Sequence, residues 1–125
     1  MSCIKLTVEP KEGGTYKISV AFATMAGVPF SPKTCHWSLT DMVGNIINDR
    51  YQVAKVVSGT SEDFIIFGDD LMRLSADDDF RRLFTVQITF DATFDGIDYN
   101  DLPDGAQVEF SIAPLEIFSA TPPAP

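Results

Sequence analysis

The sequence predicts an all-β protein built as an antiparallel sandwich of seven to nine short strands. Apolar and polar residues alternate with a period of two over several stretches, which is typical of half-buried strands. Eight glycines and eight prolines are spread between these stretches and supply turns. No stretch carries sustained helical periodicity, so only one short helical turn is expected, near residues 69–74.

Two alternating stretches open the chain. Residues 3–9 end at Pro10, and residues 15–24 repeat the pattern after a Gly13-Gly14 turn. The two strands form either a hairpin or neighbours across the sandwich. The residues expected to face the core are Ile4, Leu6, Val8, Tyr16, Ile18, Val20 and Phe22.

The third strand, residues 34–40, surrounds the only tryptophan. Cys35, Trp37 and Leu39 share one face of this strand, and the intervening polar residues share the other. Because tryptophan buries more apolar surface than other side chains, we expect Trp37 to anchor the core.

Shorter elements are predicted in the middle of the chain. Residues 46–50 and 52–57 are expected to form two short strands, and residues 63–67 form a fully apolar strand. The helical turn follows, and its cap is either Asp69 or Asp70.

Acidic residues dominate the segment after the helical turn. Residues 75–79 are predicted to be a solvated loop that includes the triplet Asp77-Asp78-Asp79. Arg81 and Arg82 follow directly, so we expect paired charges at the end of this loop.

The most regular strand is predicted over residues 83–91, followed by a long loop at residues 93–105 and a last strand at residues 107–112. The residues of these strands expected to face the core are Phe84, Val86, Ile88, Phe90, Val108, Phe110 and Ile112. A single domain over residues 1–120 and an extended proline-rich tail over residues 121–125 are therefore expected.

Composition restricts the possible functions. The chain has 125 residues and a formal net charge of −9, with 18 acids against 9 bases. Nucleic-acid binding depends on clustered Lys and Arg, so it is not expected. We also expect no membrane span, because no apolar run approaches about 20 residues. No signal peptide is expected either, because the N-terminus lacks the basic, then apolar, then small-residue order of one. The predicted location is cytosolic.

The two cysteines, Cys3 and Cys35, have opposite strand parity. A disulfide requires matching Cβ directions, so two free thiols are expected. Two cysteines and one histidine are also too few for a zinc site of the Cys/His type.

No residue set indicates catalysis. His36 is the only histidine, and no serine lies in a Gly-x-Ser-x-Gly elbow. An EF-hand loop starting at Asp91 would need a glutamate where Leu102 stands. The acids of residues 91–104 form either turns in a solvated loop or an irregular calcium site. We therefore predict a non-enzyme with no catalytic residue, no metal ligand and no cofactor.

A binding surface is the more plausible functional site. The loops at residues 26–32 and 93–104 are expected to cluster at one end of the sandwich, as in immunoglobulin-type topologies. Apolar anchors with a charged rim suit a protein interface. The candidate interface residues are Phe30, Phe94, Ile97, Tyr99 and Asp101. Alternatively, Phe94 and Ile97 plug the end of the core.

Trp37 on the third strand, together with the strand count, resembles the immunoglobulin-like sandwich. The second strand offers Ile18 and Val20, and the penultimate strand offers Val86 and Ile88, where antibody domains carry a disulfide. The tyrosine corner is also missing. The resemblance therefore implies the architecture and not an antibody or receptor function.

A second resemblance lies in the segments Trp37-Ser38-Leu39-Thr40-Asp41, Gly44-Asn45-Ile46-Ile47-Asn48 and Gly68-Asp69-Asp70-Leu71. This series is similar to short sandwich proteins encoded among the structural genes of tailed bacteriophages. The likeness implies a virion protein of the tail or head-tail region, in the virion or the host cytoplasm, that contacts itself or other virion proteins and can form a homo-oligomer. The alternative hypothesis is a carbohydrate- or surface-binding module, assisted by calcium, that uses Tyr99 and Phe94 with loop acids.

Overall fold

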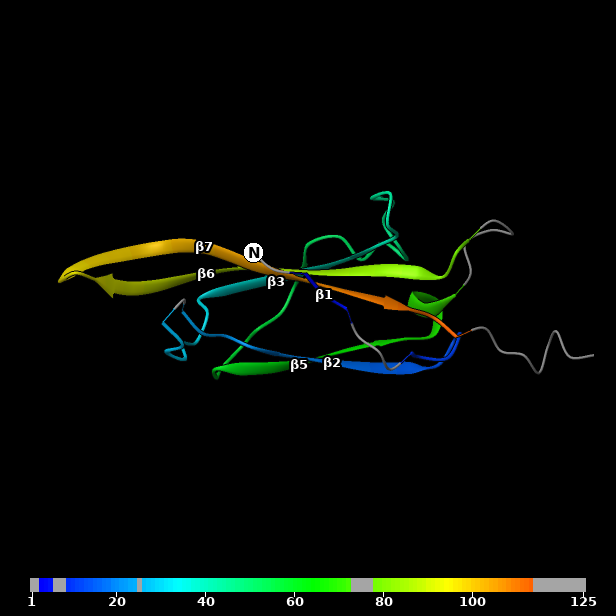
Figure 1. Ribbon diagram of the computed structural model, residues 1–125, viewed down its shortest axis with the longest axis horizontal. Helices are drawn as coiled ribbons and strands as arrows, with labels where there is room; N and C mark the ends of the chain where they lie inside the picture. Colours follow the sequence, from blue (N-terminus) through cyan, green and yellow to red (C-terminus); the bar gives the residue numbers. More distant parts are fainter. Residues whose placement is uncertain (1–2, 6–8, 25, 73–77, 114–125) are drawn as a thin grey trace, which may run out of the picture.

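The computed structural model describes residues 3–5, 9–24, 26–72 and 78–113, and of residues 3–5 it describes the backbone. Two sheets lie one over the other (Figure 1), a five-stranded sheet of order β1-β7-β6-β3-β4 and a two-stranded sheet of β2 and β5. All strand pairs are antiparallel except β1 with β7. The predicted all-β class with two sheets is confirmed.

The described elements follow the chain in this order: β1 (Cys3–Lys5), β2 (Thr15–Ala21), β3 (Thr34–Thr40), β4 (Val53–Ala54), β5 (Ser61–Phe67), the 3-10 turn η1 (Gly68–Leu71), β6 (Arg81–Phe94) and β7 (Ile97–Ser111). Among the described residues η1 is the only helix, and no described helix is long and apolar enough to cross a membrane.

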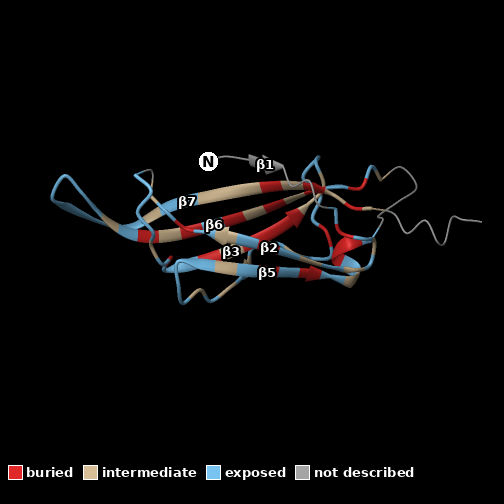
Figure 2. Ribbon diagram, turned by 60° about the horizontal axis from the view of Figure 1, so that its bottom comes forward, coloured by how far each residue is buried: buried red, intermediate tan, exposed pale blue. Residues whose placement is uncertain are grey.

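The core lies between the two sheets, and the predicted inward faces of three strands are confirmed. Figure 2 shows buried residues alternating along β6 and the second half of β7, whereas in β3 the outward-facing Ser38 is buried together with Trp37 and Leu39. Trp37 is buried, with its ring centroid 5.5 Å from that of Phe84, which in turn lies 5.2 Å from Phe64 of the opposite sheet. Such aromatic pairs contribute about 0.5–1.5 kcal/mol each beyond their area. Cys35 is buried with a free thiol, as expected.

The first two predicted strands lie in different sheets, so they are neighbours across the sandwich and not a hairpin. In β2, Ile18 and the following Phe22 are buried, and Tyr16 and Val20 pack against the core. Leu6 and Val8 lie outside the described residues. The predicted strand at residues 63–67 lies within β5, in which Phe64 and Ile66 face the core while Ile65 and Phe67 are exposed.

The predicted strand at residues 46–50 is wrong. Asn48 and Asp49 have φ values of 51° and 57°, and the Arg50 N–H donates to the Ile47 carbonyl at 2.9 Å. Positive φ at both central positions makes a tight turn, which Asn and Asp tolerate better than other non-glycine residues. The neighbouring predicted strand at residues 52–57 contracts to β4 (Val53–Ala54).

Asp70 is fully buried in η1 and organises one end of the sandwich. Its carboxylate accepts hydrogen bonds from Phe67 N–H at 3.1 Å, Asn48 Nδ2 at 2.8 Å and Arg50 Nε at 2.8 Å. Burial alone would raise the pKa of Asp70, but these hydrogen bonds, with that from Arg50 the largest, hold it below its usual value. The predicted helical turn is present at Gly68–Leu71, but its N-cap is Phe67, so the prediction that Asp69 or Asp70 is the cap is wrong.

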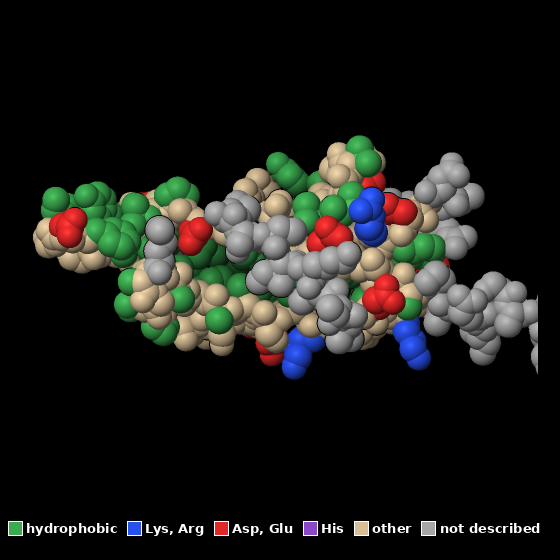
Figure 3. Space-filling view, in the orientation of Figure 1, with side chains coloured by type: hydrophobic (Ala, Val, Ile, Leu, Met, Phe, Trp, Pro, Cys, Tyr) green, Lys and Arg blue, Asp and Glu red, His purple; other side chains and the backbone are tan. Residues whose placement is uncertain are grey.

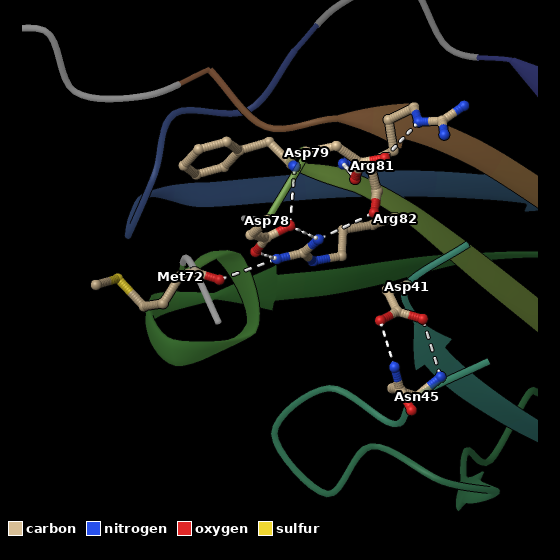
Figure 4. A network of polar contacts seen from close by, with 8 residues as sticks. Asp41, Asn45, Met72, Asp78, Asp79, Arg81 and Arg82 are labelled. Carbon is tan, nitrogen blue, oxygen red and sulfur yellow. Dashed lines mark hydrogen bonds and ion pairs between the residues drawn. The ribbon is translucent and has the colours of Figure 1, made fainter. Parts of the chain in front are cut away.

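The predicted pairing of Arg81 and Arg82 with the preceding acids is confirmed for Asp79 and Asp78 (Figure 4). The solvated-loop prediction is wrong for Asp78, whose side chain is almost fully buried. Arg82 shares the inward parity of β6 and is fully buried, so its guanidinium needs a carboxylate partner, and it also donates to the Met72 carbonyl at 3.1 Å. Residues 75–77 lie outside the described residues.

The long loop predicted at residues 93–105 is a β-hairpin. β6 and β7 continue to Phe94 and Ile97 and are joined by Asp95-Gly96, with φ values of 53° and 77°. This is the two-residue turn with positive φ at both positions that Asp-Gly strongly favours. The tail at residues 121–125 and the predicted domain end at residue 120 lie outside the described residues.

Candidate functional site

The outer part of the β6–β7 hairpin, residues 91–102, projects beyond the other strands of both sheets and is called the arm here. In Figure 1 it forms the left end of the molecule, past the starts of β3 and β5. All its residues except Ala92 and Leu102 are exposed, as the pale blue of Figure 2 shows. A hairpin that extends past its own core presents surface that its own fold does not cover.

One face of the arm is apolar. Residues directly opposite each other on paired strands share a face, and the described pairs are Ala92 with Tyr99 and Phe94 with Ile97. These four residues therefore line one side, where Phe94, Ile97 and Tyr99 are 46%, 56% and 41% exposed. Hydrophobic side chains cover much of the projecting end in Figure 3.

The opposite face of the arm is polar. It carries Thr93 paired with Asp98, and the Thr93 hydroxyl donates to the Asp98 carboxylate. The arm is thus a two-sided ribbon, and only the apolar side has surface that gains free energy from leaving water.

The apolar face continues directly from the core. Phe90 pairs with Leu102 on the same side of the hairpin, and Phe90 stacks on Phe30 with ring centroids 4.3 Å apart. Phe30 also lies 6.2 Å from Phe22 of the opposite layer. Beyond these rings the two-stranded sheet ends, so the inward face of the long hairpin emerges into solvent.

A polar clamp fixes the base of the arm. The strand register shifts between Phe90 and Ala92, and Asp101 lies in the bulge with φ 56°. The Asp101 N–H donates to Asp91 at 3.0 Å, and Lys33 Nζ reaches Asp101 at 2.8 Å and Asp91 at 3.3 Å. The hydrogen bond from the Asp101 N–H has the largest effect on the pKa of Asp91 and lowers it. The ion pair with Lys33 lowers it further, against a raising effect of desolvation. The clamp sets the direction in which the arm leaves the sheet.

The five predicted interface residues divide into two groups. Phe94, Ile97 and Tyr99 lie together and exposed on the arm, so Phe94 and Ile97 do not plug the core. Phe30 instead closes the end of the core, and Asp101 belongs to the clamp. The loop at residues 26–32 meets the base of the arm through Phe30, as expected from clustering at one end.

Sequence reasoning missed the hairpin itself, together with Ala92, Leu102 and Lys33. The signal was the Asp95-Gly96 pair between alternating segments, which is a strong hairpin indicator. Lys33 has no such signal, because its partners lie far along the chain.

Other surfaces offer less. A cavity of about 170 Å³ lies between the edge of β2 and the middle of β7, which is small for a ligand site of roughly 300–1,000 Å³. An open groove on the outer face of β3, β6 and β7 contains His36. Within the described ranges, no three His, Cys, Asp or Glu side chains gather to hold a metal.

No family model, curated protein or solved structure matches this chain. The exposed apolar face of the arm, with Phe94, Ile97 and Tyr99, is therefore chosen as the candidate site from its exposure and its place in the fold.

Proposed function

We propose that this protein is a non-catalytic structural module that assembles through protein–protein contacts, with the arm as its main contact. The observation that best supports this proposal is that Phe94, Ile97 and Tyr99 are exposed together on one side of a projecting hairpin. Aromatic and aliphatic anchors with few rotatable bonds suit interface centres, and aromatic residues are enriched there. The Lys33 clamp supports this role, because a pre-oriented arm loses less entropy on binding.

Sheet edges supply a second route to contact. In the described part of the chain, β2 and β5 pair only with each other, so each leaves one edge without a strand partner. The unpaired backbone N–H and C=O groups at such an edge can form hydrogen bonds with a strand of another chain.

The assembly we propose is the virion of a tailed bacteriophage, in its tail or head-tail region. Support comes from the sequence resemblance in the segments that begin at Trp37, Gly44 and Gly68. The partners would be further copies of the chain or other virion proteins, without a cofactor or nucleic acid.

We also propose an immunoglobulin-like architecture for the sandwich. The order β7-β6-β3-β4 corresponds to the sheet G-F-C-C′ of variable-type domains, and β2 with β5 corresponds to strands B and E. Trp37 on β3 supports the correspondence. Residues 55–60 form no strand D between β4 and β5. A solved structure with a different chain order of strands would reject this proposal.

The experiment compares solution mass by light scattering for the wild type and the double variant Phe94→Ser, Ile97→Ser over a wide concentration range. The mass of the wild type should rise with concentration, and the variant should keep the mass of one chain. Thr93→Ser, on the polar face of the arm, is the matched control and should behave as the wild type. Equal mass curves for the wild type and the double variant would reject the arm as the contact.

A further inference from the structure

We propose that the free edge of β2 binds an extended segment of a partner protein, which adds a strand there, places one aromatic side chain in the cavity between β2 and β7, and sets a basic residue against Asp104. This inference rests on the edge contact proposed above, adds the edge and the chemistry of the partner, and does not depend on the arm. Three observations support it: unpaired backbone groups on β2, a cavity that matches one aromatic ring, and a carboxylate at the mouth of that cavity.

The edge of β2 that faces away from β5 carries unpaired backbone groups. The Phe22 N–H donates to the Thr60 carbonyl, just before β5, so residues of this parity direct their backbone groups toward β5. Backbone groups alternate in direction along a paired strand, so Ser19 and Ala21 direct theirs to the opposite edge. No described residue forms a backbone hydrogen bond with β2 on that side. An added strand would pair with these groups.

The first strand of the chain does not pair with this edge. In the immunoglobulin-type sandwich, strand A belongs to the same sheet as strand B, to which β2 corresponds in the arrangement proposed above. The described strand that precedes β2 is β1, and it pairs with β7 of the larger sheet. A strand supplied by another protein would therefore extend the smaller sheet at the place that strand A has in that fold, as in donor-strand complementation.

The cavity beside this edge matches one aromatic side chain. Its volume is about 170 Å³, and an apolar cavity of about 150 Å³ holds a benzene molecule. A residue of the added strand opposite Val20 or Phe22, which both pack into the core, would also direct its side chain inward, because opposite residues share a face. The apolar residues that line the cavity include Val20, Phe22, Phe30, Val86, Ile88 and Ala106.

A carboxylate at the mouth of the cavity sets the second requirement for the partner. Asp104 lines the cavity and is exposed, and its pairing with the buried Ile88 places it on the inward side of β7. It accepts a hydrogen bond from the N–H of Gly105 at 2.8 Å, and no cation in the described part of the chain pairs with it. Residues two apart on a strand share a face, so a lysine or arginine two residues from the aromatic anchor would face Asp104.

Other occupants fit this site less well. The arm of a second copy, residues 91–102, contains no lysine or arginine and carries several acids, so it would bring like charge to Asp104. A small apolar molecule would fill the cavity and leave the backbone groups of Ser19 and Ala21 without a partner. A basic, extended segment with one aromatic anchor satisfies the edge, the cavity and the carboxylate together.

The probe is the capped peptide Thr-Lys-Thr-Phe-Thr-Lys-Thr, which has phenylalanine and both lysines on one face and threonine on the other. It should slow the amide hydrogen exchange of Ser19 and Ala21, because only an added strand pairs with these N–H groups. Alanine in place of the phenylalanine should weaken binding about tenfold or more. Glutamate in place of the lysines should weaken it by a similar factor. A peptide with methylated backbone nitrogens keeps the side chains, loses the donors, and should not protect these amides.

Three protein variants test the three features separately. Ala21→Pro removes an N–H at the free edge, where proline is tolerated, and should weaken binding about tenfold or more, whereas the matched control Ala21→Thr should bind as the wild type does. Ala106→Leu fills the cavity and should weaken binding to a similar extent. Asp104→Asn should weaken binding about tenfold at low salt and less at high salt. Unfolding followed by Trp37 fluorescence checks that each variant is folded.

The outcomes separate this inference from the role of the arm. Unchanged exchange of Ser19 and Ala21 at millimolar peptide overturns it, and equal binding of the methylated peptide shows a side-chain pocket without strand addition and also overturns it. If the peptide does not bind but Ala21→Pro abolishes assembly of the protein in light scattering, the occupant is a second copy and the inference is wrong. The variant Phe94→Ser, Ile97→Ser should bind the peptide as the wild type does, so failure of the arm as a contact leaves this result intact.

Discussion

Arg50 Nε donates a 2.8 Å hydrogen bond to the fully buried carboxylate of Asp70. The Arg50 guanidinium also lies over the Trp37 ring, 5.6 Å from its centroid. The tight turn that carries Arg50 is thereby attached both to η1 and to Trp37 of β3. One arginine thus joins three segments that are distant along the chain.

Replacing Asp70 by Asn should lower the free energy of unfolding by about 2–3 kcal/mol. A buried pair that loses one charge typically loses about 3–5 kcal/mol, and Arg50 is partly exposed, which reduces the effect. The measurement is denaturant unfolding followed by the fluorescence of Trp37, the only tryptophan. The control Asp79→Asn breaks a solvent-exposed pair with Arg81 and should lower the free energy of unfolding far less. Equal losses for both variants would contradict this assignment.

Acid should destabilise the protein. Hydrogen bonds lower the pKa values of Asp41, Asp70, Asp79 and Asp91 in the folded state, in Asp41 and Asp70 against the opposing effect of burial. A lowered folded pKa contributes stability that is fully present above the unfolded value of about 3.9 and is lost as the pH falls through the folded pKa. The free energy of unfolding, measured at a series of pH values, should be flat above about pH 5 and should fall below about pH 4. The Asp70→Asn protein should show a shallower fall, and an identical slope would argue against a contribution from Asp70.

Cys35 should be unreactive in the folded protein. Its side chain is 3% exposed, and burial, followed by the nearby Glu62, raises the pKa of the thiol, so little nucleophilic thiolate forms at neutral pH. In a Cys3→Ser background, a thiol reagent should modify Cys35 only as fast as the protein unfolds. The same protein in denaturant gives the unprotected rate. Fast modification without denaturant would show that this part of β3 opens locally.

Gly96→Val should loosen the tip of the arm and leave the core intact. The backbone at Gly96 has φ 77°, where a side chain adds roughly 1–2 kcal/mol of strain. Amide hydrogen exchange should accelerate at Phe94 and Ile97, the pair that flanks the turn, while the unfolding midpoint seen by Trp37 stays unchanged, because the arm lies outside the core. The control Gly59→Ala changes a loop glycine whose added Cβ would make only an ordinary van der Waals contact, 4.0 Å from the Ser61 carbonyl oxygen, and it should leave the exchange of the arm unchanged. A large fall in the unfolding midpoint for Gly96→Val would mean that the arm is part of the cooperative core.

The alternation of the sequence determined which face of each long strand is buried. The inward residues of β3, β6 and the second half of β7 follow from the period of two, because successive side chains of a strand point to opposite sides. The same alternation, together with the absence of sustained helical periodicity, indicated the all-β class. These are local properties, and neighbouring residues suffice to specify them.

Tertiary structure decided everything that depends on partners distant in the chain. Arg50 meets Asp70, and Lys33 meets Asp101, only because packing of the sheets brings their segments together. The same inward pattern that buries Phe90 continues through Phe94 and Ile97, yet these two are exposed because the two-stranded sheet ends before it reaches them. Periodicity specifies the direction of a side chain, and only the extent of the opposing layer decides whether water reaches it.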